Sequence, residues 1–168
     1  MDGTQLKAVQ GPLKERYRND PKAALVTLRA EGRASGLSCR VETGKALVEA
    51  GLHPATGGDG TAACSGDMLL EALVACAGVT LRAVATSLGM DVRDAVITAE
   101  GDLDFRGTLG VSKDVPVGFA DVRLRFVVDT DASAEELATL LKLTERYCVV
   151  LQTLRSAPQI SAVMNRSS

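Results

Sequence analysis

Alternating apolar and polar residues predict where this chain forms strands. Within residues 121–129, apolar side chains occupy every second position from Val122 to Val128, as expected for a strand that is buried on one face. Residues 91–105 predict a second long strand. Shorter strands are predicted at 23–30, 37–43, 45–50 and 160–164.

The strands at 23–30 and 37–43 predict a hairpin. The stretch between them, Glu31–Gly36, contains glycines that permit the positive φ angles of tight turns. We therefore expect a turn here, with Arg33 in it.

A long apolar segment at about 68–88 predicts a buried helix. Ser65 or Asp67 is expected to cap its start, and Gly89 to close it. Glu71 and Arg82 within the segment would be costly in lipid, so the sequence favours a core helix over a membrane span. Because the helix is apolar almost all round, it fits a core or the interior of a dimer.

Three further helices complete the pattern. Residues 1–22 predict a short polar helix that Pro21 ends. Ser133 and Glu136 form a capping-box pattern before a helix at 134–146. A last helical segment follows Cys148. The element order predicts an α+β fold in a single domain, 1–168, with 1–22 as an N-terminal helical extension.

Composition narrows the function classes. The 168 residues are 46% hydrophobic and 24% charged with a net charge of −2, which excludes a disordered or strongly basic protein. Only 3% are aromatic, which argues against nucleic-acid binding. The polar N-terminus lacks the apolar core of a signal peptide, so we expect a cytoplasmic protein that binds no membrane.

Four cysteines and one histidine are the candidates for thiol or metal chemistry. Their spacing contains no CxxC or CxxH pair, so we expect no metal and no cofactor. In a reducing compartment the cysteines are free thiols. Taken alone, Cys76 and Cys148 are most simply buried apolar residues.

Two cysteine contexts resemble a known family. Residues Ser65–Thr80 place Asp67 nine positions before Cys76 on an Ala/Leu-rich helix, and Glu145–Leu151 surround Cys148. Both segments resemble the thiol motifs of the OsmC/Ohr family of organic hydroperoxide reductases. The loop Gly57-Gly58-Asp59-Gly60 and the opening Leu13–Arg18 are similar to further parts of that family.

The resemblance implies an OsmC-like fold and a mechanism. Antiparallel sheets would wrap around a long buried central helix in an intertwined homodimer. Cys76 would attack an organic hydroperoxide, Cys148 would resolve the product as a disulfide, and an external dithiol would reduce that disulfide. An apolar pocket with residues such as Leu73 and Val79 would favour alkyl peroxides.

The family's activating arginine falls best on Arg33, with Arg40 as second choice, and its acid falls on Asp67, with Glu71 as a weaker candidate. Because Cys76 lies about nine residues inside its helix, we expect a cation to stabilise its thiolate. Asp67 and Cys76 fall on opposite sides of the helix, so Asp67 would act through Arg33 or across a subunit interface. As alternatives, Arg33 is a solvated turn residue and Asp67 a helix cap.

The sequence also departs from the family pattern. Val149 stands where a proline is common, and Asp67 replaces a glutamate. Cys64 is an extra thiol and an alternative candidate for the resolver, Cys39 is most simply core, and His53 is expected at the surface. Two alternative functions stay open: a non-catalytic protein that binds a small ligand or senses redox state, and a purely structural dimeric domain.

Overall fold

A computed structural model describes residues 3–35, 38–41 and 50–166, and side chains for 8–27, 33 and 50–166. Its main sheet has four antiparallel strands in the order β2-β1-β5-β6. These strands are β1 (Leu25–Ser35), β2 (Ser38–Val41), β5 (Asp94–Asp104) and β6 (Asp121–Asp129). A second, two-stranded parallel sheet joins β3 (Ala50–Gly51) to β4 (Ala63–Cys64).

The predicted alternation sets the two faces of the main sheet. In β5 every second residue from Ala95 to Leu103 is buried, and β6 alternates exposed and half-buried residues from its first residue to its last. Strand β6 has the predicted bounds, and β5 lies within the predicted 91–105. The buried side chains of β5 and the half-buried ones of β6 form the inner face of the sheet.

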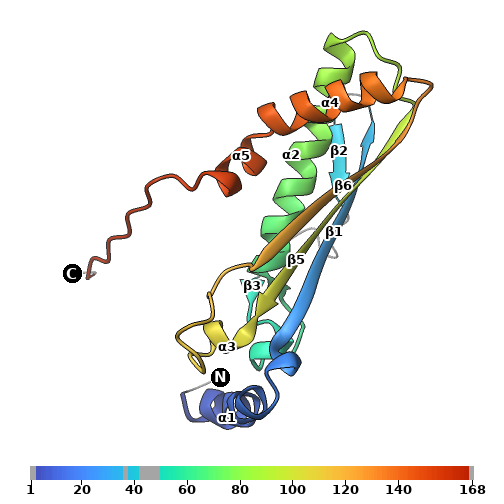
Figure 1. Cartoon of the computed structure of the whole chain (residues 1–168). Coiled ribbons are helices and arrows are strands. Elements are labelled where there is room, and N and C mark those ends of the chain that lie inside the picture. The colour runs from blue at the N-terminus through green and yellow to red at the C-terminus, as the bar shows by residue number, and fades with distance from the viewer. Residues whose placement is uncertain (1–2, 36–37, 42–49, 167–168) are drawn as a thin grey trace.

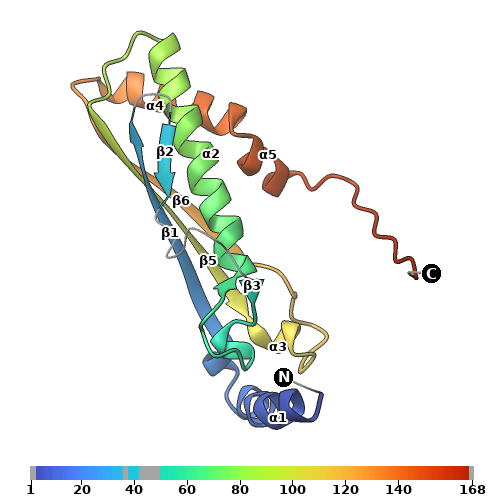
Figure 2. The same ribbon diagram turned by 180° about the vertical axis from the view of Figure 1, so that it is seen from behind.

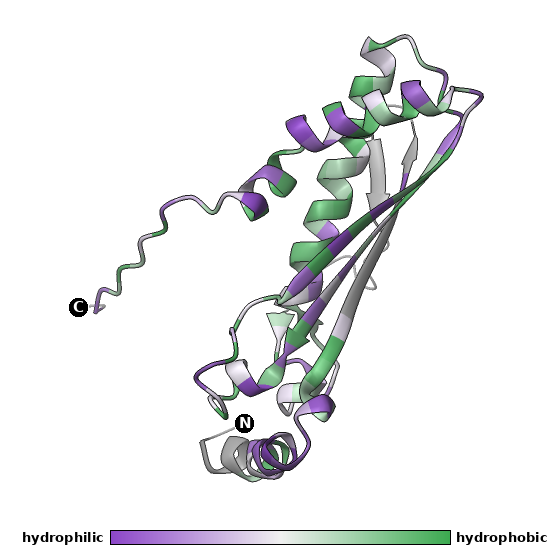
Figure 3. Cartoon of the chain, in the orientation of Figure 1, coloured by the Kyte–Doolittle hydropathy of each residue, from purple (hydrophilic) through white to green (hydrophobic). Residues whose placement is uncertain are grey.

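The helix α2 (Ser65–Ser87) runs along this inner face (Figure 1). Its buried residues contact the sheet and include Leu70, Leu73, Val74, Ala77 and Leu81. Figure 3 shows green, apolar residues along most of the helix. By length and composition alone α2 would be able to cross a membrane, but core helices pass the same test and α2 packs on the sheet.

Two C-terminal helices pack on α2 rather than on the strands. They are α4 (Ala134–Tyr147) and α5 (Val149–Arg155). The predicted capping box is confirmed, since the Glu136 N–H donates to the Ser133 hydroxyl and the Glu136 carboxylate accepts from the Ser133 N–H. Seen from behind, α4 and α5 lie beside the upper and middle parts of α2 (Figure 2).

The N-terminal helix α1 (Gly3–Asn19) lies at the far end of the sheet and falls within the helix predicted at 1–22. The short helix η1 (Pro21–Ala24) links it to β1. The Tyr17 hydroxyl donates to the Ala55 carbonyl at 2.7 Å, and the Gln10 amide donates to the Thr56 carbonyl at 3.1 Å. These bonds attach α1 to the short helix η2 (Pro54–Thr56).

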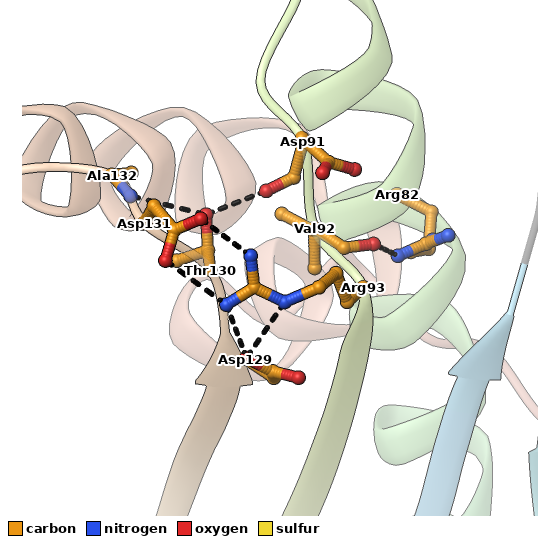
Figure 4. Close-up of polar contacts among 8 residues, drawn as sticks. All are labelled: Arg82, Asp91, Val92, Arg93, Asp129, Thr130, Asp131 and Ala132. Carbon is orange, nitrogen blue, oxygen red and sulfur yellow. Dashed lines mark hydrogen bonds and ion pairs between the residues drawn. The ribbon is translucent and has the colours of Figure 1, made fainter.

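Polar contacts join the other end of the sheet to α2 (Figure 4). Arg93 lies just before β5 and binds Asp129 at 2.6 Å and Asp131 at 2.7 Å, both near the end of β6. The Arg82 guanidinium on α2 donates to the Val92 carbonyl. The turn after α2 is thereby tied both to the sheet and to the start of the α4 segment.

The predicted hairpin turn is wrong in position. Residues 31–35 continue β1, and Arg33 pairs with Arg40 on β2 and Val96 on β5. Pairing on both sides supplies backbone hydrogen bonds that override the turn preference of this glycine-containing stretch. Conversely, Ala23 and Ala24 belong to η1 rather than to the strand.

Three other expectations need correction or fall outside the description. Residues 160–164 form no strand and extend away from the fold, with Ile160 85% and Met164 97% exposed. Most of the strand predicted at 45–50 lies outside the described residues. Cys64, not Ser65 or Asp67, is the N-cap of α2. The segment after β5 opens with a short helix, α3 (Phe105–Thr108).

Candidate active site

One stripe of α2 presents a thiol among apolar side chains. Leu69, Leu73, Cys76 and Thr80 follow one another at spacings of four, three and four residues, which places them on one side of the helix. Cys76 is half-buried. The same side of α2 therefore carries the candidate nucleophile, a hydroxyl and two leucines.

The second thiol lies where α4 stops and α5 begins. Cys148 has an extended backbone (φ −72°, ψ 105°) and serves both as the C-cap of α4 and as the N-cap of α5. Its side chain is completely buried. The first N–H groups of a helix have no partner within it, so the start of α5 offers donors beside this thiol.

The fold brings the two thiols into hydrogen-bonding contact. Burial raises the pKa of the Cys76 thiol, but four donors outweigh it, and the pKa falls below its ordinary value. These donors are the Val150 N–H, the Cys148 thiol, the Val149 N–H and the Thr80 hydroxyl. Each stabilises negative charge on the sulfur, so Cys76 is the thiol that ionises first.

Cys148 behaves in the opposite way. The pKa of Cys148 is raised to about 11, chiefly by burial and also by the neighbouring Cys76, although the Leu151 and Val150 N–H groups oppose the shift. At neutral pH Cys76 therefore ionises more readily than Cys148, which keeps its proton. Two free thiols in contact, with unequal acidity, can form a disulfide after one of them is oxidised.

Sequence reasoning expected a cation beside the Cys76 thiolate. Among the described residues, uncharged hydrogen-bond donors lower the Cys76 pKa instead. The groups that lower the pKa of Cys76 are backbone N–H groups at the start of α5 and two side-chain donors, none of them charged. Sequence reasoning missed Thr80, although its position four residues after Cys76 places both on one helix face. The N–H groups of Val149 and Val150 follow from the helix break at Cys148.

Arg33 does not join the thiols within this chain. Its guanidinium pairs with Asp94 at the start of β5 at 3.3 Å, and its side chain is 67% exposed. In the antiparallel sheet Arg33 pairs with Val96, near the start of β5. The side chain of Arg40 lies outside the described residues.

Asp67 lies in the first turn of α2, away from Arg33. Burial raises the pKa of Asp67, and the nearby His53 partly offsets that effect. Burial also raises the pKa of Glu71, with a further contribution from Asp67. Asp67 therefore belongs to a cluster with His53 and Glu71, and it lies half a turn from Cys76 around the helix, as the sequence predicts.

His53 is not a simple surface residue, which corrects the expectation. It is half-buried and stacks on Phe105 with ring centroids 4.9 Å apart. Its Nδ1 accepts a hydrogen bond from the Ala55 N–H at 3.0 Å. In a neutral imidazole, that bond leaves the proton on Nε2.

The remaining thiols lie apart from the pair or outside the description. Cys64 precedes Cys76 by twelve residues, or about 18 Å along a helix axis, so it cannot replace Cys148 as resolver without unwinding α2. The side chain of Cys39 is not among those described. In the described part of the chain, no three His, Cys, Asp or Glu side chains converge as metal ligands.

An apolar cavity of about 890 Å³ reaches Leu69 and Leu73 of the α2 stripe, but Cys76, Thr80 and Cys148 are not part of its lining. Leu69 and Leu73 line it from α2, and Leu151 and Leu154 from α5; β6 and α4 form the remaining walls. The expectation for Leu73 is thus confirmed. Val79 is not part of the lining, and its side chain is 40% exposed on the outer side of α2.

Comparisons with known proteins agree with this architecture. The model of the family described as OsmC-like protein matches residues 58–163. A solved structure, an OsmC-like hydroperoxide resistance protein from Jannaschia sp. CCS1, superposes with a TM-score of 0.61 and 20% sequence identity, covering 85% of this chain and 95% of that one. No curated protein matches the chain. Because the family model covers more than half of the sequence and includes both thiols, the chain belongs to the OsmC-like protein family.

Proposed function

We propose that this protein is a thiol-dependent peroxidase that reduces organic hydroperoxides. The observation that carries the proposal is the contact between two thiols of unequal acidity, with Cys76 activated and Cys148 protonated. The Jannaschia protein is named as a hydroperoxide resistance protein, which supports the same reaction class. Cys76 is the peroxidatic residue, and Cys148 is the resolving residue.

The reaction has two steps on the protein. The Cys76 thiolate attacks the terminal oxygen of R–O–O–H, the O–O bond breaks, and Cys76 becomes a sulfenic acid while the alkoxide takes a proton and leaves as R–OH. Cys148 then attacks the Cys76 sulfur. The S–O bond breaks, a disulfide forms, and the hydroxide leaves as water with the proton from Cys148.

The apolar cavity at Leu69 and Leu73, which share one side of α2 with Cys76, supports an apolar substrate. Its lining is mostly leucine, valine and phenylalanine, and its volume is in the range of small-molecule sites. An alkyl group bound there would place its peroxide end toward the Cys76 stripe, whereas hydrogen peroxide would gain nothing from the apolar walls. The proposal therefore favours organic hydroperoxides over hydrogen peroxide.

An external dithiol completes the cycle. Thiol–disulfide exchange would return Cys76 and Cys148 to the reduced state. A reducing compartment, such as the cytoplasm, would maintain this supply. The half-buried position of Cys76 leaves it the more accessible of the two sulfurs for the attacking thiol.

We further propose that the working unit is a homodimer. The outer side of α2 carries Met68, Ala72, Ala75, Val79 and Ala83, a stripe without charge, of which Ala72, Val79 and Ala83 are exposed in the single chain. Burying such a surface against a second copy would remove apolar area from water. Arg33 pairs with Asp94 within one chain and is not among the groups that act on Cys76, so we propose that it reaches the site of a second copy.

The test is turnover by the reduced protein with cumene hydroperoxide and a dithiol such as dihydrolipoamide. We expect turnover in the wild type, its loss in Cys76→Ser, and full retention in Cys64→Ser as the matched control. Retention of full turnover in Cys76→Ser would disprove the assignment. Oxidation of Cys76 without turnover under any dithiol would favour the redox-sensing alternative instead.

A further inference from the structure

A buried hydroxyl without a partner lies four residues before the resolving cysteine. Thr144 on α4 is fully buried, and its Oγ1 makes no hydrogen bond to any residue that the structure describes. A threonine in a helix usually satisfies its hydroxyl by bonding to a preceding carbonyl. Leaving a buried hydroxyl unpaired costs stability, so this one requires an explanation.

The position of Thr144 relates it to Cys148. Leu140, Thr144 and Cys148 follow at intervals of four residues, all completely or almost completely buried, and form the inward stripe of α4 that packs toward α2. The Cys148 N–H donates to the Thr144 carbonyl at 3.0 Å. Thr144 lies in the last turn of α4, and Cys148 caps that turn, so the two residues are about one helical turn apart along the chain.

In the reduced protein this hydroxyl has nothing to stabilise. The Cys148 thiol keeps its proton and directs it to the Cys76 sulfur. Once Cys76 is oxidised, the requirement reverses: the Cys148 sulfur must lose its proton in order to attack. It must do so in a fully buried position, where each donor to a thiolate has a large effect.

We propose that the Thr144 hydroxyl is a donor held in reserve for the Cys148 sulfur, and that it accelerates the resolving step alone. This inference rests on the proposed function, because that function supplies the organic hydroperoxide that oxidises Cys76. Cys148 lies at the break between α4 and α5, and in this proposal its sulfur comes within reach of the Thr144 hydroxyl as the disulfide to Cys76 forms.

The step balances without another reagent. The Cys148 sulfur, with the Thr144 O–H directed to it, attacks the sulfenic sulfur of Cys76. The S–O bond breaks, the S–S bond forms, and the proton from Cys148 combines with the departing hydroxide to give water. Cys148 is oxidised, the sulfenic sulfur is reduced, and Thr144 keeps its own proton.

The variant Thr144→Val tests the proposal because valine keeps the shape and removes the hydroxyl. After a pulse of cumene hydroperoxide, we expect sulfenic acid on Cys76 to form at the wild-type rate. The disulfide to Cys148 should form about tenfold more slowly, which corresponds to about 1.4 kcal/mol. Thr144→Ser should restore the rate, and Thr139→Val, at an exposed threonine of the same helix, should leave it unchanged.

A second oxidant separates this proposal from the proposed function. Diamide oxidises two thiols to a disulfide through an adduct on the first thiol, which the second thiol then displaces, and the diamide is reduced to a hydrazine. If the wild type resists hydroperoxide, the peroxidase proposal fails, but slow Cys76–Cys148 closure by diamide in Thr144→Val would still support the reserve donor. If the disulfide in Thr144→Val closes at the wild-type rate, the reserve-donor proposal is wrong. A more stable fold in that variant would then show that the buried hydroxyl only destabilises the protein.

Discussion

At the scale of single residues, the environment of each thiol decides the order of events. Cys76 and Cys148 are the same side chain, but Cys76 receives four hydrogen-bond donors while Cys148 is held in a completely buried position. In the proposed mechanism oxidation therefore begins at Cys76. Cys148 is a hydrogen-bond donor to Cys76 in the reduced protein, and we propose that it is the nucleophile toward Cys76 afterwards.

Replacing Thr80 with valine should make Cys76 less reactive at neutral pH. Loss of one donor to a thiolate is worth on the order of one pKa unit, so we expect iodoacetamide to modify Cys76 up to about tenfold more slowly. Because only the thiolate reacts, the rate should rise through the Cys76 pKa as pH increases, with the midpoint shifted upward in the variant. Peptide mapping at a series of pH values measures this.

The control for this variant is Thr86→Val on the same helix. The Thr86 hydroxyl donates to the Arg82 carbonyl at 2.8 Å and is exposed, so its removal should leave the Cys76 profile unchanged. Identical profiles in Thr80→Val and the wild type would contradict the proposed contribution of Thr80 to the thiolate.

How well the sequence predicts the site depends on the residue. The two thiols were identified from their contexts, and the structure brings them together. The donors to Cys76 were missed because two are backbone groups, whose position depends on where α5 begins relative to α2. Arg33 was placed in a turn that the structure replaces with paired strands, and its role stays a prediction for the dimer.

At the scale of the elements, the site depends on how α4 and α5 are fixed against α2. The capping box holds the first turn of α4, while Cys148 interrupts the helix and frees the N–H groups that face Cys76. Regular alternation and strong caps made β6 and α4 predictable. The antiparallel pairing of the hairpin was predicted, but its turn was misplaced because pairing with β5 extends β1 through residues 31–35. The strand predicted at 160–164 is absent, because none of the described strands pairs with these residues.

The variant Ser133→Ala should destabilise the protein by about 1 kcal/mol, because it removes the hydroxyl that caps α4. Urea unfolding followed by circular dichroism measures this change. Ser156→Ala, at an exposed serine after α5, serves as the comparison and should change the free energy of unfolding by much less. An equal loss in both variants would show that the cap contributes nothing specific.

Removing one hydroxyl group tests how α1 is attached to the rest of the fold. Tyr17 is 2% exposed and its hydroxyl binds the Ala55 carbonyl, so Tyr17→Phe should lower the free energy of unfolding by about 1 kcal/mol. The other tyrosine, Tyr147, is 57% exposed, and Tyr147→Phe should be neutral. A neutral Tyr17→Phe would mean that the bond does not hold α1 to the fold.

At the scale of the whole molecule, the single chain leaves apolar surface uncovered. The uncharged outer stripe of α2, the 890 Å³ cavity and the exposed apolar residues of the tail all face outward. Isolated exposed apolar residues are ordinary, but contiguous ones indicate an interaction surface. The proposed homodimer accounts for the stripe on α2.

The variant Val79→Glu should therefore separate the dimer into monomers. A carboxylate buried without a partner costs several kcal/mol, enough to outweigh a modest interface. Light scattering coupled to size-exclusion chromatography measures the mass directly. Val127→Glu, at an exposed valine on the outer face of β6, is the control and should keep the wild-type mass. A monomeric wild type would contradict the dimer.

The most direct test of the central claim is to count thiols before and after one equivalent of cumene hydroperoxide. The reduced protein should lose two of its four thiols per chain, and a peptide map should find Cys76 joined to Cys148, with Cys39 and Cys64 still free. Survival of all four thiols in excess hydroperoxide would contradict the account, because the activated thiol pair would then not react with its proposed substrate.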